Sequence, residues 1–325
     1  IVVATSGDTG AAAISAIKNR KNMKIFVLHP DNKISKIQRK FMTTVNAKNI
    51  FNIALKSNFD ECQKFVKLMF GDKDFASAIN MSGVNSINWS RIIIQIVYYF
   101  FSYFKVAKKN EKINFSVPTG NFGDIYAGYI AKKMGLPINK LIIATNSNDI
   151  LNRVLKTGVY KPSKVKHTVS PSMDIQVASN FERLIFDVCS SNSYKTFKLM
   201  ENLKKLGEFK LEKKELKKIK ENFYSESLSN AETRLIIRKT YKSRKTLIDP
   251  HTAVALGAVN KMSLKEKTIV LSTAHPSKFL DVVLKETDIK PQLPENLKNI
   301  LTKKEKYKKL PKDLKKIKNY ILANV

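Results

Sequence analysis

One glycine-bearing turn has the residue types and spacing to hold a phosphate group. It spans residues 116–124 and contains Gly120 and Gly123, between a predicted strand at 112–117 and a predicted helix at 125–134. At such a junction several backbone N–H groups have no helical partner, the helix dipole favours an anion, and glycines allow a ligand to approach closely. An ordinary tight turn is the alternative, because one glycine pair after a strand is a weak motif.

A second turn of small residues, at 5–10, joins a partial strand at 1–4 to an alanine-rich helix at 11–18. Its hydroxyl groups and free N–H groups suit a carboxylate or a phosphate. Because two such turns occur in one chain, a binding role is favoured over chance.

Polar residues 82–91 lead into an apolar run at 92–104. Asn and Ser at a helix start are typical caps. Arg91, however, would enter the first turn of a very apolar helix, where a guanidinium normally has an anionic partner. We favour a ligand phosphate over a structural carboxylate as that partner. The run contains Gln95 and Ser102 and is shorter than the roughly 20 residues of a membrane span, so it predicts a buried helix.

These residues must be positioned by strands and helices that alternate at short spacing. Strands are predicted at 24–30, 51–55, 140–146 and 267–271, and helical segments at 33–39, 58–70 and the lysine-rich, solvated 195–224. Alternation of this kind is typical of βαβ units around a parallel sheet, in which ligands bind where strands end and helices begin. We therefore predict an α/β protein of two domains with parallel-rich sheets flanked by helices. Residues 1–105 would form the smaller domain, and residues 106–325 the larger one with a basic helical tail.

The net charge is the unusual feature of the composition. Hydrophobic content of 43% and charged content of 26% are ordinary, but the formal net charge is +32 and invites a nucleic-acid partner. Only eight of the 59 basic residues are arginine, the side chain best shaped for bidentate phosphate and guanine contacts. The lysines are spread along the whole chain, so we expect a solvated basic surface and no nucleic-acid or membrane partner.

The two cysteines form neither a metal pair nor a disulfide framework. Cys62 and Cys189 are far apart in the sequence, which makes a reducing, cytoplasmic setting the default, and no metal site is predicted. Cys62 shares one face of the 58–70 helix with apolar side chains and is predicted to be core packing. Asp249 and Pro250 are typical of a helix start, where we favour a structural over a catalytic role for His251.

Six motifs in order along the chain closely resemble those of threonine synthases. They are residues 4–10, 85–88, 116–124, 172–175, 249–253 and 273–279. The resemblance runs in register from residue 1 to the end. It implies a pyridoxal 5'-phosphate (PLP) enzyme of the tryptophan-synthase-β-like fold type II. Such an enzyme converts O-phospho-L-homoserine and water to L-threonine and phosphate, the final step of threonine biosynthesis.

The resemblance also implies cofactor residues. The turn residues that would hold the cofactor phosphate are Gly120, Asn121, Phe122 and Gly123. Thr273 would hydrogen-bond the pyridine nitrogen. A hydroxyl cannot fully protonate that nitrogen as a carboxylate would, which suits chemistry at the β and γ carbons.

Substrate residues follow from the same resemblance. In the turn after the first strand, Ser6, Gly7 and Thr9 would grip the substrate carboxylate. Asp8 would flank the cofactor ring, although many relatives of this fold carry Asn there. The positions expected around the substrate phosphate are Lys33, Ser35, Asn88 and Arg91.

The lysine that binds the cofactor covalently has no match in the sequence. Ile1 to Ala4 look like a strand already in progress, so we expect a fragment whose lysine lies upstream and whose targeting signals cannot be judged. Lys278 shares a short loop with Thr273, whereas the ring nitrogen and the aldehyde carbon lie at opposite ends of the pyridine. We therefore expect these 325 residues alone to be inactive.

Two other interpretations stay open. Another fold type II PLP lyase could act on a different amino acid, without the anion site of Asn88 and Arg91. A relative of another class could be catalytically inactive and bind phosphate or nucleic acid, with an affinity that falls steeply with salt.

Overall fold

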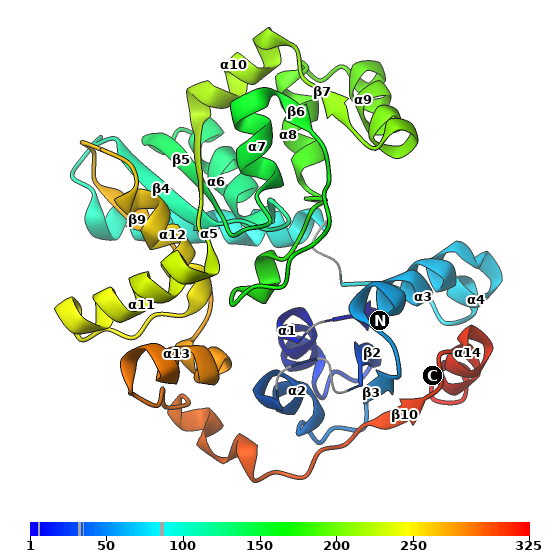
Figure 1. The fold of residues 1–325 in the computed structure, drawn as a ribbon. Coiled ribbons are helices and arrows are strands. Elements are labelled where there is room, and N and C mark those ends of the chain that lie inside the picture. The colour runs from blue at the N-terminus through cyan, green and yellow to red at the C-terminus, as the bar shows by residue number, and fades with distance from the viewer. Residues whose placement is uncertain (6, 32–33, 35, 85–87) are drawn as a thin grey trace. The chain divides into compact units, whose positions relative to one another are not determined.

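A computed structural model describes residues 1–325 except 6, 32, 33, 35 and 85–87. The chain divides into two compact units (Figure 1). Unit 1 comprises Ile1–Asn85 and Gln292–Val325, and unit 2 comprises Ser86–Pro291. The sequence-based division at residue 105 placed residues 86–105 with the first part and the C-terminal tail with the second. The structure groups each of these segments with the other unit.

Unit 1 is built on a parallel sheet in the order β1-β2-β3-β10. Its strands are β1 (Val2–Ala4), β2 (Ile25–Pro30), β3 (Ile50–Leu55) and β10 (Lys308–Leu310), and its helices are α1 (Asp8–Ile17), α2 (Lys36–Thr43), α3 (Phe59–Gly71), α4 (Lys73–Ala78), η3 (Glu295–Leu301) and α14 (Leu314–Leu322). Successive residues of β2 point to opposite faces, and both faces are covered: Phe26 and Leu28 join one apolar cluster, and Ile25 and Val27 join another. This two-sided burial explains why residues 25–28 of the strand are all apolar.

The C-terminal tail completes unit 1. Strand β10 pairs in parallel with β3, with Lys308 opposite Ile53. Helix α14 then buries Ile317 and Ile321 in the cluster that contains Cys62. The tail therefore contributes an edge strand and a packed helix to the sheet of the N-terminal residues.

Unit 2 is built on a parallel sheet in the order β8-β5-β4-β9. Its strands are β4 (Ile113–Pro118), β5 (Ile138–Thr145), β8 (Phe223–Ser227) and β9 (Thr268–Val270), with a separate antiparallel pair of β6 (Val159–Tyr160) and β7 (Phe209–Lys210). Its helices are α5 (Trp89–Val106), α6 (Gly123–Lys133), α7 (Ile150–Thr157), η1 (Pro171–Met173), α8 (Phe181–Val188), α9 (Ser193–Leu206), α10 (Lys213–Asn222), α11 (Asn230–Arg244), α12 (Pro250–Asn260), η2 (Pro276–Phe279) and α13 (Leu280–Thr287).

Alternate residues of β5 assign the helices of unit 2 to the two faces of its sheet. Leu141 and Ile143 pack with α5, α6, α7 and α8, whereas Ile142 and Ala144 pack with α12. The strands predicted at 112–117, 140–146 and 267–271 are confirmed as β4, β5 and β9. Strand β8 was not predicted, because its first residues fall in the segment interpreted as helical.

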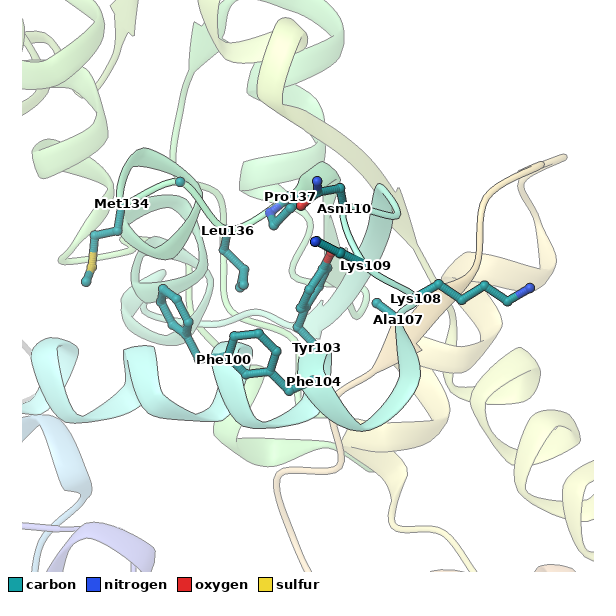
Figure 2. A pocket seen from close by; sticks show the side chains of 11 residues that line it. Phe100, Tyr103, Phe104, Ala107, Lys108, Lys109, Asn110, Met134, Leu136 and Pro137 are labelled. Carbon is teal, nitrogen blue, oxygen red and sulfur yellow. The ribbon is translucent and has the colours of Figure 1, made fainter.

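The prediction that residues 92–104 form a buried helix is wrong for one face of α5. Tyr99 and Tyr103 pack into the core, but Phe101 and Phe104 are 64% and 73% exposed. The run is apolar around the whole helix, and only one side of a helix can face the sheet. An apolar hollow of about 420 Å³ lies at the C-terminal end of α5. Figure 2 shows Phe100, Phe104 and Leu136 among the side chains that line it. In the described part of the chain, the apolar helical stretches all fall short of what a membrane crossing requires.

Candidate functional site

The glycine turn of unit 2 connects β4 to α6 as predicted. Thr119 N–H donates to the carbonyl oxygen of Ala144 over 2.8 Å, which ties the end of β4 to β5. Helix α6 begins at Gly123 after Phe122, the N-cap residue, whose φ of 65° is left-handed, and no side chain caps this end. The first-turn N–H groups therefore have neither a helical nor a side-chain acceptor. This arrangement can hold an anion.

Neighbouring loops hold the turn in place. A Cβ atom on Gly120 would lie 2.9 Å from the carbonyl oxygen of Ser172, so only glycine fits there without a shift of backbone. The carbonyl oxygen of Asn121 accepts from Asn180 N–H at 3.0 Å and from Asn180 Nδ2 at 3.2 Å. The turn is therefore fixed on two sides before any ligand arrives.

Phe122 keeps its left-handed backbone through aromatic packing. Its side chain is buried, with ring centroids 5.2 Å from Phe181 and 5.8 Å from Phe223. A non-glycine residue in this conformation costs on the order of 1 kcal/mol and persists only where its surroundings impose it. Here the aromatic cluster holds Phe122 in this conformation at the start of α6.

The residues that follow β9 reach the same edge of the sheet as the glycine turn. Strands β9 and β4 are adjacent and parallel, with Val270 opposite Ser116, and Leu271 N–H donates to the carbonyl oxygen of Ser116 over 3.0 Å. Thr273 comes two residues later and is exposed. The structure therefore brings Thr273 and the Gly120–Gly123 turn to neighbouring strand ends.

Asp124, in the first turn of α6, was not singled out from the sequence. The Tyr99 hydroxyl oxygen lies 2.8 Å from its carbonyl oxygen and 3.1 Å from Oδ1. Burial raises the pKa of Asp124 to about 6. A carboxyl group that is readily protonated opposes a nearby anion less than an ordinary aspartate does. The only sequence signal was its place directly after Gly123.

The loop at residues 168–176 lies against Gly120 of the glycine turn. Asp174 Oδ1 accepts from Asn146 Nδ2 at 2.8 Å and from Asn148 Nδ2 at 3.0 Å, while its Oδ2 accepts from Thr168 N–H at 2.9 Å. Both asparagines follow β5 directly and are buried. Asp174, in the motif at 172–175, thus fixes the loop whose Ser172 carbonyl oxygen lies beside Gly120.

The turn of unit 1 is organised by Thr5. Its Oγ1 accepts from the N–H groups of Gly7 and Gly10 at 2.9 Å each, and Gly7 has a φ of 139° that other residues rarely adopt. Asp8 and Thr9 begin α1, and Gln38 Nε2 donates to Asp8 Oδ1 over 3.5 Å. The predicted site residues Ser6, Lys33 and Ser35 lie outside the described residues.

Asn88 and Arg91 open α5. Asn88 is the N-cap, and its Oδ1 accepts from Ser90 N–H at 3.0 Å, so the capping interpretation is confirmed for it. Arg91 Nη1 is buried with no hydrogen-bond partner among the described residues, and burial lowers the pKa of its guanidinium. A cation in the first turn also opposes the helix dipole. Arg91 therefore has an unused donor suited to an anion.

The cysteines are free and buried, and Cys62 packs in the core of unit 1 as predicted. Burial raises the pKa of both thiols. Within the described ranges no three His, Cys, Asp or Glu side chains gather closely enough to hold a metal ion.

Comparisons with known proteins agree with this geometry. Residues 1–273 match the family described as pyridoxal-phosphate dependent enzyme, and residues 252–321 match the threonine synthase C-terminal family. Threonine synthase from Saccharomyces cerevisiae is 44% identical, covering 99% of this chain and 68% of the yeast protein. The enzyme from Pseudomonas aeruginosa is 42% identical, covering 99% and 69%.

Solved structures give the same result. The crystal structure of PLP-bound threonine synthase from Brucella melitensis matches with a TM-score of 0.96 at 44% identity, covering 99% of this chain and 70% of that chain. Serine racemase from maize matches at 12% identity with a TM-score of 0.56 and shares the fold alone. The predicted fold, with parallel sheets flanked by helices, is confirmed as that of fold type II PLP enzymes. The chain belongs to the threonine synthase family of pyridoxal-phosphate-dependent enzymes.

Proposed function

We propose that this chain forms part of a PLP-dependent threonine synthase that converts O-phospho-L-homoserine and water to L-threonine and phosphate in the cytoplasm. The observation that carries the proposal is the meeting of an uncapped glycine turn and Thr273 at neighbouring strand ends of unit 2. Two free, buried cysteines are consistent with a reducing compartment.

The cofactor residues are assigned by the chemistry of each group. We assign the cofactor phosphate to the turn Gly120, Asn121, Phe122 and Gly123, where first-turn N–H groups lack acceptors. We assign the pyridine nitrogen to the exposed hydroxyl of Thr273 and a place beside the ring to Asp8. When bound, PLP would supply the electron sink that loss of the substrate phosphate and addition of water require.

The substrate residues are assigned in the same way. Ser6, Gly7 and Thr9 would bind the carboxylate, and Asn88, Lys33 and Ser35 would join Arg91 around the phosphate. Arg91 has the clearest physical basis, because its buried Nη1 has no hydrogen-bond partner among the described residues. A guanidinium there would bind the phosphate and stabilise the charge that grows on it as it leaves.

We expect the lysine that binds the cofactor covalently to lie outside residues 1–325. Lys278 is in η2, five residues after Thr273, and one short loop cannot readily reach both ends of the pyridine ring. Borohydride treatment of these residues mixed with PLP should leave no stoichiometric lysine adduct. An adduct at one lysine would contradict this assignment.

The test of function is product formation by the full-length protein. With PLP, it should release phosphate and form L-threonine from O-phospho-L-homoserine, and it should not act on unphosphorylated homoserine or serine. Equal activity on an unphosphorylated substrate would favour a different lyase of the same fold. No activity together with no PLP binding would refute the proposal.

A pair of threonine variants tests the cofactor assignment. Thr273→Val removes the hydroxyl proposed to face the ring nitrogen, and we expect it to shift the absorption spectrum of bound PLP and to lower activity at least about tenfold, which corresponds to 1.4 kcal/mol. Thr268→Val, on β9 of the same segment, is the control. Equal spectra and activities for both variants would contradict the role of Thr273.

A further inference from the structure

A buried pair of residues lies between the two loops that carry the cofactor residues of unit 2. Asp249 is fully buried and is the N-cap of α12, and His251 is 3% exposed in the first turn of that helix. The sequence suggested only a structural role for His251. The hydrogen bonds of the pair, however, lead toward Gly120 in one direction and toward Thr273 in the other.

The first direction runs through the imidazole. Asp249 Oδ1 lies 2.9 Å from His251 Nδ1, and since a carboxylate only accepts, Nδ1 carries the proton. Nε2 is then an acceptor, and Ser172 N–H donates to it over 3.3 Å. The carbonyl oxygen of the same Ser172 is the group that would lie 2.9 Å from a Cβ atom on Gly120. The imidazole thereby holds Ser172, whose carbonyl oxygen lies against Gly120 of the phosphate turn.

The second direction runs through the other carboxylate oxygen. The Thr252 hydroxyl donates to Asp249 Oδ2, and Thr252 Oγ1 lies 3.2 Å from Ser272 Oγ. Because Thr252 donates its one hydroxyl hydrogen to the carboxylate, its Oγ1 can only accept from the Ser272 hydroxyl. Ser272 immediately precedes Thr273. One carboxylate is therefore linked to both loops.

We propose that Asp249 and His251 are positioning residues that set the separation between the phosphate turn and Thr273. The inference rests on the proposed function. The phosphate and the ring nitrogen of PLP are joined by a nearly rigid framework, so both must be met at one fixed spacing. Loss of the link should weaken the binding of a ligand that contacts both the phosphate turn and Thr273. The binding of a ligand that contacts only one of them should change little.

Two amide variants separate the two hydrogen bonds of the imidazole in the first direction, the one with Asp249 and the one with Ser172. His251→Gln can place an amide oxygen near the former Nε2 and so keep the bond from Ser172. His251→Asn can place its amide near the former Nδ1, which keeps the bond to Asp249 and loses Ser172. The full-length protein and both variants are titrated with PLP, with pyridoxal, which lacks the phosphate, and with inorganic phosphate.

The expected signature is a selective loss of PLP binding. For His251→Asn we expect PLP to bind about tenfold more weakly, the change that 1.4 kcal/mol produces, while pyridoxal and inorganic phosphate change by less than about twofold. His251→Gln should retain most of the PLP affinity. The control is Val254→Ala, a core substitution on the same helix that loses packing without touching the link.

The outcomes divide clearly. Equal losses for all three ligands, or losses matched by Val254→Ala, would show a merely structural role and overturn the inference. Unchanged PLP affinity in His251→Asn would overturn it while leaving the proposed function intact. Failure of the unmodified protein to bind PLP at all would overturn both.

Discussion

Replacing Arg91 with methionine should stabilise the protein and remove the part of its response to phosphate that depends on this side chain. The buried Nη1 has no hydrogen-bond partner among the described residues, and an unsatisfied buried donor costs about 1 to 3 kcal/mol. The cation also opposes the dipole of α5, which adds roughly 0.5 kcal/mol. Methionine keeps an apolar stem of similar length. Because Arg91 as a whole is only partly buried, we take the lower half of the first range and expect the free energy of unfolding of Arg91→Met to rise by about 1.5 to 2.5 kcal/mol without ligand.

Saturating phosphate should make the unmodified protein more stable to unfolding than Arg91→Met. An anion bound by Arg91 stabilises the unmodified protein by about 2.7 kcal/mol at a concentration one hundred times the dissociation constant. The variant should lack this gain. Phosphate at the glycine turn would stabilise both proteins equally, so the difference between them reports on Arg91. Urea unfolding with and without phosphate measures both quantities.

Arg153→Met is the matched control within unit 2. Arg153 has partners, since its Nε lies 3.0 Å from Asp149 Oδ1 and its Nη2 lies 3.2 Å from Gln176 Oε1. Its replacement should lower stability by about 0.5 to 1.5 kcal/mol and leave the phosphate response unchanged. The reasoning on Arg91 is refuted by a less stable Arg91→Met without ligand, or by an equal gain from phosphate in that variant.

Two further substitutions test the electrostatics and the packing of unit 2. The pKa of Asp124 is raised from 3.8 to about 6, so the folded state holds this proton more tightly and its stabilising effect, complete below pH 3.8, is lost as pH rises through 6. Relative to Asp124→Asn, the unmodified protein should lose up to about 3 kcal/mol of stability between pH 4 and pH 7, and a flat difference would contradict the raised pKa. On α5, Phe101→Ser should change the free energy of unfolding by less than about 0.5 kcal/mol, whereas Tyr103→Ala should lower it by about 3 kcal/mol. Similar urea midpoints for those two variants would contradict the assignment of Phe101 to the exposed face of α5 and of Tyr103 to its buried face.

The sequence alone was sufficient for strands β1 to β5 and β9, for the two turns and for singling out Arg91. Strands could be assigned at 112–117, which has β-branched and aromatic residues, and at 140–146, where residues 141–144 are all apolar as burial on both faces demands. The glycine turn could be placed because strand, glycine pair and helix follow one another between residues 112 and 134. Arg91 stood out because a charge in an apolar helix start needs a partner. Each of these signals is local in the chain.

Only the tertiary structure decided which distant surfaces meet. The pairing of β10 with β3 joins residues more than two hundred positions apart, and a three-residue strand with two lysines carries no local signal. An apolar run does not reveal which side of α5 faces the sheet. The bonds from Ser172 to His251 and from Tyr99 to Asp124 depend on side-chain directions that follow from packing. Local periodicity determines an element and its faces, but the partner of each face is set by the arrangement that buries most apolar surface while pairing the polar groups.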